Sequence, residues 1–305
     1  MSEIFLHCYD ASPFTQKALR MMGLKKLSYT TVETPMMPPK DDLTALTGGY
    51  RGTPVMQIGA DVYIDTQRIA AELERRFPEP GLCGSGDRGL HYMLVKWSDA
   101  FFYSALAIAI DSSAASWPAP FLADRKTLFA HLDFDAMRQD VAHSMTQYRA
   151  HAALIEKQLA DGRAFLAGAA PSLADIQAHS FVWMGKCYFP QIADGLFAGL
   201  RRILQWDARM EAIGVGTRST GTAEQAFAAA LAVKPVALHG VDAYDPLRLA
   251  AGDRVQVGPD DSRRGAVQGE LVSLTPESVA LLRSHDRCGE VIVHFPRLGY
   301  RIERA

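Results

Sequence analysis

The feature that most constrains the fold of this chain is the triplet Gly52-Thr53-Pro54, which directly precedes the apolar segment Val55 to Ile58. Because proline lacks the backbone N–H that a sheet ladder uses, Pro54 belongs at the start of a strand. A tight turn here favours the cis form of the Thr53-Pro54 bond. The N–H and C=O groups of Thr53 can then pair with an extended peptide, as an added strand would. The triplet therefore predicts a turn that binds a short peptide.

A second turn lies at Asp65 and Thr66, where a helical pattern of apolar residues begins and continues to Phe77. The Thr66 hydroxyl and the first N–H groups of such a helix form a site for a carboxylate. An ordinary helix cap also explains these residues, because Asp and Thr are favoured where helices begin. Both interpretations stay open on the sequence alone.

The third segment is near the N-terminus, where a predicted strand from Ile4 to Cys8 is followed by a predicted helix from Pro13 to Met22. Ser12 before Pro13 is the pattern of an N-cap followed by proline at the first helical position. A hydroxyl at a helix N-terminus can also donate a hydrogen bond to a thiolate, since the dipole there favours negative charge. We expect Ser12 to serve both purposes, and we interpret His7, inside the strand, as structural.

Together these segments resemble the N-terminal domain of the cytosolic glutathione S-transferase superfamily, over about residues 3 to 80. The resemblance implies a thioredoxin-like fold with glutathione as co-substrate. It also implies that Thr53, before Pro54, binds the cysteinyl backbone of glutathione, and that Asp65 with Thr66 binds its glutamyl end. Ser12 would contact the sulfur.

The segment Ser12 to Lys17 is similar to the Ser-Pro-Phe-x-x-Lys variant of bacterial members of that superfamily. Tyr9 is the alternative to Ser12 for the sulfur contact, because tyrosine-type transferases place a hydroxyl near the end of the first strand. Lys40 and Arg51 are the candidates for pairing with the glycine carboxylate. We favour Ser12 as the catalytic residue and Lys40 as the basic partner.

The middle of the chain predicts an all-helical domain. Its clearest signal is the Ser-x-x-Asp capping box of Ser172 and Asp175, which also occurs in the helical domain of the family and extends the resemblance to about residue 234. Apolar periodicity predicts helices over Gly89–Ile110, Phe134–Leu159, Leu173–Tyr188, Ile192–Ile213 and Thr222–Val233. Some aromatic residues in this region could line a pocket for an electrophile, but we favour a core role for them: Phe101, Phe102, Tyr103, Trp183, Tyr188 and Trp206.

Beyond Pro235, short alternating or apolar runs separated by turns predict a small antiparallel β-domain of five strands, arranged as a barrel in one interpretation. The runs are Arg254–Val257, Val267–Leu274, Val279–Leu282, Val291–Phe295 and Tyr300–Ile302. This domain departs from the family pattern. It would cover apolar surface or a subunit interface, the preferred interpretation, or act as a lid or partner-binding module.

The predicted organisation is thus a thioredoxin-like α/β domain over 1–80, an α-helical domain over 88–234 and the β-domain over 235–305. Pro78-Glu79-Pro80-Gly81 and Gly84-Ser85-Gly86 would link the first two.

Composition excludes several partners. With 32 Lys and Arg against 34 Asp and Glu, the net charge of −2 gives no general attraction for nucleic acid. The N-terminus lacks the basic segment of a secretory signal, and the longest apolar run, Phe101 to Ile110, is too short to cross a bilayer. We therefore expect a cytoplasmic protein without a membrane partner.

The four cysteines include no Cys-x-x-Cys pair, which argues against a zinc site and a disulfide framework.

The resemblance implies that the protein binds glutathione and activates its thiol for attack on a hydrophobic electrophilic small molecule, as a homodimer. Disulfide exchange is disfavoured because Ser12 and Thr15 stand where redox relatives carry cysteines, and Cys8 is a weak substitute. A glutathione-dependent isomerase or dehalogenase remains within the enzyme interpretation. The alternative class is a catalytically inactive module that kept the fold and uses its C-terminal β-domain to contact a partner.

Overall fold

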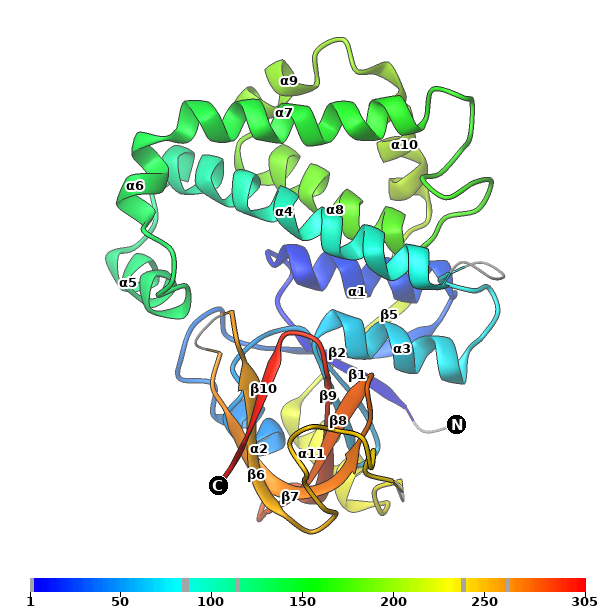
Figure 1. Ribbon diagram of the computed structural model, residues 1–305, viewed down its shortest axis with the longest axis vertical. Coiled ribbons are helices and arrows are strands. Elements are labelled where there is room, and N and C mark those ends of the chain that lie inside the picture. The colour runs from blue at the N-terminus through cyan, green and yellow to red at the C-terminus, as the bar shows by residue number, and fades with distance from the viewer. Residues whose placement is uncertain (1–2, 84–87, 114–115, 237–239, 262–263) are drawn as a thin grey trace. The chain divides into compact units, whose positions relative to one another are not determined.

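The computed structural model describes residues 3–83, 88–113, 116–236, 240–261 and 264–305 (Figure 1). The chain forms two compact units. The first contains Met1–Ala18, Ser28–Arg75 and Thr217–Ala305, and the second contains Leu19–Leu27 and Arg76–Gly216. The predicted linker Gly84-Ser85-Gly86 lies outside the described residues. The division into three domains stays a prediction.

The first unit is built on one ten-stranded sheet with the order β10-β6-β7-β8-β9-β4-β3-β1-β2-β5. Its N-terminal strands are β1 (Ile4–Cys8), β2 (Ser28–Glu33), β3 (Val55–Ile58) and β4 (Asp61–Ile64). One edge strand, β5 (Thr217–Gly221), pairs in parallel with β2 and had no counterpart among the predicted elements. The C-terminal strands are β6 (Arg254–Pro259), β7 (Val267–Leu274), β8 (Ser278–His285), β9 (Gly289–Pro296) and β10 (Tyr300–Arg304).

All five predicted C-terminal strands are present, but their predicted arrangement as a barrel is wrong. β9 pairs in parallel with β4, so these strands continue the N-terminal sheet, whose edges are β10 and β5 (Figure 1). His294 on β9 lies 2.8 Å from the Asp61 carboxylate, and its ring stacks on Tyr63 at 4.6 Å. A barrel would leave β4 with an unpaired edge, and pairing with β9 satisfies the backbone groups of that edge.

A single apolar core joins the N-terminal and C-terminal strands of this unit. Val55, Val62 and Ile64 from the first strands are buried in the same cluster as Val279 and Val293 from the last ones. Two helices add to this cluster, α2 (Asp41–Thr47) and α11 (Ala223–Leu231), and the chain also forms α1 (Pro13–Leu24) and α3 (Thr66–Arg76).

The second unit is helical, as predicted. Its helices are α4 (Arg88–Ser113), α5 (Ala119–Leu128), α6 (Phe134–Gln139), α7 (Val141–Gln158), α8 (Leu173–Tyr188), α9 (Pro190–Phe197) and α10 (Arg201–Ala212). The predicted helix 134–159 is divided at Asp140, and the predicted helix 192–213 is divided near Gly199, whose φ is +81°. Periodicity gave no indication of α5.

Helix α4 lies at the centre of this unit, against α7 and α8 (Figure 1). By length and composition, Gly89–Ser113 would pass as a membrane span, but 56% of that apolar window is buried within the protein. The core helix of a folded domain gives the same signal, so this is weak evidence for a membrane span. Phe101 on α4 and Trp206 on α10 are fully buried, whereas Tyr103 is exposed.

The predicted capping box at the start of α8 is confirmed. The Ser172 N–H donates to the Asp175 carboxylate at 3.0 Å, and the Ser172 hydroxyl donates at 2.6 Å. Asp175 also accepts the Leu166 N–H at 2.7 Å and the Trp206 indole N–H at 2.8 Å. This one carboxylate therefore connects α8 to α10 and to the loop before α8.

Candidate functional site

The register of the first unit brings the three predicted segments to one end of the sheet. His7 on β1 pairs with Val55 on β3, and Val55 pairs with Ile64 on β4. One step along the ladder, Pro54 lies between the end of β1 and the start of α3. Ser12, the Thr53-Pro54 turn and Asp65 are therefore neighbours in space, although up to 53 residues separate them along the chain.

Ser12 is the N-cap of α1. Its hydroxyl oxygen accepts the Thr15 N–H at 3.3 Å, and its carbonyl accepts the Gln16 N–H at 3.1 Å. The side chain is only 3% exposed. Because the capping bond uses a lone pair, the hydroxyl proton can still be donated to an anion at the helix N-terminus.

The Thr53-Pro54 bond is cis, as predicted. Pro54 is buried and Thr53 is partly exposed. Gly52 is required by its neighbour, since a Cβ at this position would lie 2.4 Å from the Tyr50 hydroxyl. The turn is therefore packed directly against Tyr50.

Asp65 caps α3 through its Oδ1 atom, which accepts the Gln67 N–H at 2.9 Å. Its backbone has a φ of +73°, a left-handed conformation that Asp adopts more readily than most residues. Thr66 is the first residue of α3 and is buried. The cap interpretation is confirmed for Asp65, whereas Thr66 lies within the first turn of the helix. The first N–H groups of α3 still point toward a position where a carboxylate could bind.

The two basic residues predicted as candidates for pairing with the glycine carboxylate, Lys40 and Arg51, lie in different surroundings. Lys40 is buried, precedes α2, and has its Nζ atom 5.6 Å from the centre of the Tyr9 ring. The backbone N–H of Arg51 donates to the carbonyl of Arg264 at 2.7 Å. The structure thus connects Lys40 with Tyr9, and Arg51 with the C-terminal strands.

Three aromatic or charged residues at this end of the sheet were missed by the sequence analysis. The Tyr300 hydroxyl lies 3.2 Å from Asp65 Oδ2 and 3.4 Å from the Tyr50 hydroxyl. The positive charge of Arg264 lies beside Tyr50 and favours the ionised hydroxyl, against the larger effect of burial. Burial raises the pKa of both Tyr50 and Tyr300, so both hydroxyls keep their protons. No local motif marks these residues, because two of them are about 200 or more positions from the turn they contact.

Two other titratable groups at the end of β1 are inert. Burial raises the pKa of the Cys8 thiol to about 12, so it is not a thiolate near neutral pH. Burial also lowers the pKa of His7 to about 4, against the smaller opposing effect of its 3.0 Å hydrogen bond with Gln57. His7 is therefore a neutral structural side chain, as interpreted from the sequence, and Cys8 does not replace the missing redox cysteines.

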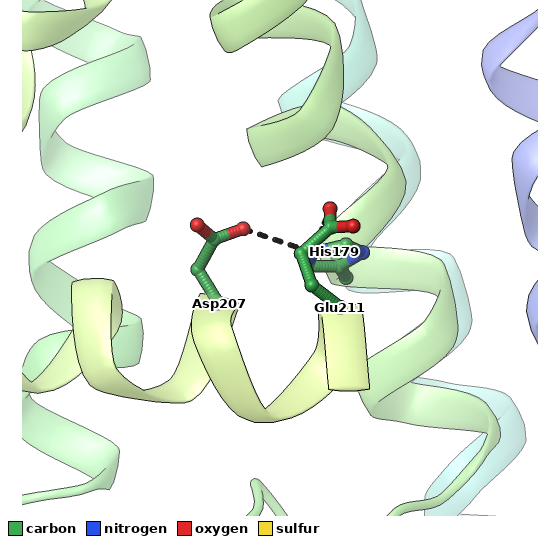
Figure 2. A group of neighbouring side chains, drawn as sticks. All are labelled: His179, Asp207 and Glu211. Atoms are coloured by element: carbon green, nitrogen blue, oxygen red, sulfur yellow. Dashed lines mark hydrogen bonds and ion pairs between the residues drawn. The ribbon is translucent and has the colours of Figure 1, made fainter. Parts of the chain in front are cut away.

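A separate polar cluster lies in the helical unit. His179 on α8 faces Asp207 and Glu211 on α10, and the three side chains have ligand atoms within 4.8 Å of one another (Figure 2). The His179 Nε2 atom lies 2.9 Å from Asp207 Oδ1 and 3.6 Å from Glu211 Oε1. The residue types and spacing are those of a metal site.

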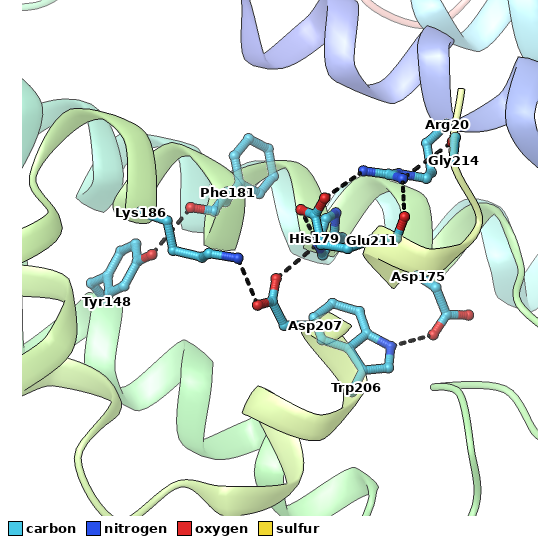
Figure 3. Close-up of polar contacts among 10 residues, drawn as sticks. All are labelled: Arg20, Tyr148, Asp175, His179, Phe181, Lys186, Trp206, Asp207, Glu211 and Gly214. Atoms are coloured by element: carbon cyan, nitrogen blue, oxygen red, sulfur yellow. Dashed lines mark hydrogen bonds and ion pairs between the residues drawn. The ribbon is translucent and has the colours of Figure 1, made fainter. Parts of the chain in front are cut away.

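The surroundings of this cluster favour a structural role. Lys186 pairs with Asp207 at 2.8 Å, and Arg20 on α1 pairs with Glu211 at 3.4 Å (Figure 3). Burial raises the pKa of Asp207, but the hydrogen bonds from His179 and Lys186 outweigh it and hold the pKa below its usual value. Two cations already neutralise the two carboxylates, so we assign the cluster to fixing α8, α10 and the end of α1 that belongs to this unit, from Leu19 onward.

Comparison with known proteins identifies the family to which this fold belongs. The model of the family described as glutathione S-transferase, N-terminal domain, matches residues 6–81. A GST-like protein from Pseudomonas syringae, known from its crystal structure, is 33% identical, with 100% of each chain covered and a TM-score of 0.83. This chain belongs to the glutathione S-transferase superfamily. No protein with a curated description matches the sequence.

Other members of the superfamily share the fold at lower identity. A glutathione S-transferase of Ceriporiopsis subvermispora in complex with glutathione is 17% identical, with a TM-score of 0.58, and the match covers 69% of this chain and 97% of that one. One from Methylobacterium radiotolerans in complex with glutathione sulfonate is 18% identical, with a TM-score of 0.51 and coverage of 72% and 98%. These alignments leave more than a quarter of this chain unmatched, whereas the P. syringae protein matches it throughout.

Proposed function

We propose that this protein binds glutathione at the end of the sheet formed by β1, β3 and β4, and activates its thiol for attack on an electrophilic small molecule. The observation that carries the proposal is the register that gathers Ser12, Thr53 and the N-terminus of α3 at that end. In this arrangement Thr53 pairs with the cysteinyl backbone, and Asp65 with Thr66 binds the glutamyl end. Superfamily members crystallised with glutathione or glutathione sulfonate support the choice of ligand.

The chemistry requires a thiolate. A free thiol titrates near pH 8.5, so only about 3% of glutathione is ionised at pH 7. Lowering its pKa by about two units needs about 2.7 kcal/mol of preferential stabilisation of the anion. A hydrogen bond from the Ser12 hydroxyl and the N-terminus of α1 together supply energies of this order.

In the proposed reaction the thiol releases its proton to solvent when glutathione binds. The sulfur lone pair then forms a bond to the electrophilic carbon, and the leaving group departs with the electron pair of its own bond. Ser12 orients the sulfur and is not covalently modified, unlike the serine of a hydrolase, which needs a base to take its proton. A homodimer in the cytoplasm is part of the proposal, and light scattering tests the oligomeric state.

Calorimetric titration of glutathione into the wild-type protein and two variants tests this function. We expect Thr66→Ala to weaken binding about tenfold, because it removes a hydrogen bond to a charged group. We expect Ser12→Ala to retain binding but lose the thiolate absorbance of the bound ligand. Ser116→Ala, at an exposed turn of the helical unit, is the control. A folded wild-type protein that binds no glutathione would contradict the proposal.

One observation favours a second candidate, a binding module without transferase activity. Both carboxylate oxygens of Asp65 already have partners within the protein, Gln67 and Tyr300. If these contacts exclude the ligand, the fold would act through another surface. Absence of both glutathione binding and turnover with a panel of electrophiles would support this candidate.

A further inference from the structure

The C-terminal strands reach the turn that carries the proposed ligand groups. The carbonyl of Arg264, in the connection between β6 and β7, accepts the Arg51 N–H at 2.7 Å. Tyr300, the first residue of β10, lies 3.2 Å from the Asp65 carboxylate through its hydroxyl. All four residues belong to the first compact unit. The C-terminal segment therefore contacts this end of the sheet at two places, through the connection between β6 and β7 and through β10.

The first of these contacts is a close approach of two backbone segments. A Cβ on Gly265 would lie 2.2 Å from the carbonyl oxygen of Gly49, and Gly265 has a φ of +91°. Only glycine combines this conformation with so short a separation. The position of Arg264 is thus fixed by its backbone, so its side chain has a defined place at this end of the sheet.

The Arg264 side chain lies beside the proposed site. Its guanidinium is 5.8 Å from the centre of the Phe14 ring, two residues after Ser12, and its charge acts on the Tyr50 hydroxyl. Its ion pair with Asp261 is loose, at 3.9 Å, and the side chain is only 16% exposed. Within the described part of the chain these contacts leave several of the five N–H donors of the guanidinium unused. A shielded guanidinium of this kind is suited to a carboxylate.

Tyr300 acts on Asp65 instead. A phenol has one proton, and the charged Asp65 oxygen is a stronger acceptor than the Tyr50 hydroxyl, so we place the donation at Asp65. The Asp65 carboxylate is thereby held from two sides, by Gln67 through Oδ1 and by Tyr300 through Oδ2. Its remaining lone pairs can accept the N–H groups of an ammonium.

We propose that Arg264 and Tyr300 make the C-terminal strands part of the glutathione site: Arg264 binds the α-carboxylate of the glutamyl residue, and Tyr300 positions Asp65 to receive its α-ammonium. This inference rests on the proposed function. It gives the C-terminal strands a role in selecting ligands that end in a free amino acid. Arg264 is a binding residue, whereas Tyr300 is a positioning residue.

Calorimetry with glutathione and two analogues tests the inference. γ-Aminobutyryl-cysteinyl-glycine lacks the α-carboxylate, and glutaryl-cysteinyl-glycine lacks the α-ammonium. We expect the wild-type protein to bind each analogue at least about tenfold more weakly than glutathione, which is the size expected for one charged hydrogen-bonded contact. This comparison requires no variant.

The variants then assign each contact. Arg264→Met should weaken glutathione binding about tenfold or more but leave the analogue without the carboxylate unaffected, and Arg264→Lys should restore part of the loss. Tyr300→Phe should weaken glutathione severalfold but leave the analogue without the ammonium unaffected. Arg301→Met changes an exposed arginine next to Tyr300 on the same strand and serves as the matched control.

The outcomes separate this inference from the proposed function. If Arg264→Met weakens all three ligands equally, or none, Arg264 does not bind the α-carboxylate and the inference fails while glutathione binding stands. Equal losses for Tyr300→Phe would likewise remove Tyr300 from its role. A wild-type protein that binds no glutathione overturns the proposed function and this inference with it.

Discussion

At the scale of single residues, the groups proposed to bind glutathione also hold the fold together. The Ser12 hydroxyl caps α1, and the Asp65 carboxylate caps α3. A helix N-terminus that needs a cap in the free protein presents the same N–H groups and dipole to an anionic ligand. Structural and functional roles coincide at these positions, so only a measurement on the ligand distinguishes them.

The buried histidine of β1 predicts a pH dependence of stability. Burial lowers the pKa of His7 to about 4 in the folded protein, below the ordinary value of 6.5. The unfolded chain therefore takes up a proton more readily, and the contribution of His7 to stability is present above pH 6.5 and lost as the pH falls toward 4. Between pH 7 and pH 5 we expect a loss of about 2 kcal/mol.

Urea unfolding at both pH values measures this loss. His7→Gln keeps a donor for Gln57 but cannot titrate, so the difference between the two pH values should shrink by most of that amount. His143→Gln, at an exposed position of α7, is the control. An unchanged difference in His7→Gln would assign the pH dependence to other groups, including His294, whose pKa burial also lowers.

The sequence singled out five residues that the fold brings to one end of the sheet, and their roles in binding stay predictions. These residues could be recognised because each stands beside a strand or helix end whose local pattern is distinctive. The register of β1, β3 and β4 then brings them together: Ser12, Thr53, Pro54, Asp65 and Thr66. Tyr50, Arg264 and Tyr300 were not found. Their place depends on pairing between segments far apart in sequence, and a tyrosine or arginine in a turn carries no local signal of such pairing.

At the scale of elements, predictions were most accurate where local chemistry defines an end. Helix α8 begins after its capping box and matches its predicted bounds, and β3 and β7 also match. Helix breaks at Asp140 and Gly199 were missed because apolar periodicity continues on both sides of them. The edge strand β5 was missed because its residues, Thr-Arg-Ser-Thr-Gly, are polar and mostly exposed.

The contacts between α8 and α10 predict unequal effects of two substitutions. Asp207 is buried and accepts from both His179 and Lys186, whereas the Lys186 side chain is 43% exposed. We expect Asp207→Ala to lower the free energy of unfolding by about 2–4 kcal/mol, because His179 loses its buried partner. Lys186→Met should cost less than about 1 kcal/mol, as for other exposed ion pairs.

Thermal or urea unfolding of the two variants, each compared with the wild-type protein, measures these costs. Equal losses in both would show that the Lys186 pair, and not the His179 contact, stabilises this cluster. The measured thiolate signal of bound glutathione should not change in either variant, since neither residue belongs to the unit that carries the proposed site.

At the scale of the whole molecule, the strands beyond residue 235 are part of the sheet that carries the proposed site. Sequence patterns identified these strands one by one but could not show that β9 pairs with β4. Alternating apolar residues indicate that a strand has a buried face, but they do not indicate which strand lies beside it. The predicted barrel failed for this reason.

Removal of residues 235–305 therefore has a definite expected result. The shortened chain would expose the β4 edge and the apolar residues that now pack against β7, β8 and β9. We expect loss of the cooperative unfolding transition and aggregation, measured by calorimetry and size-exclusion chromatography. Recovery of a folded, monodisperse 1–234 fragment would contradict this and identify the C-terminal strands as an independent domain.

The pairing of β9 with β4 also sets the order of events on the ribosome. Asp61 and His294, which meet across these strands, are 233 residues apart. Because a chain is synthesised at about 5–20 residues per second, β4 is made roughly 10–50 s before β9. Throughout that interval the nascent chain carries a strand with an unpaired edge. The contact between Asp65 and Tyr300 can form only after Tyr300 has left the exit tunnel.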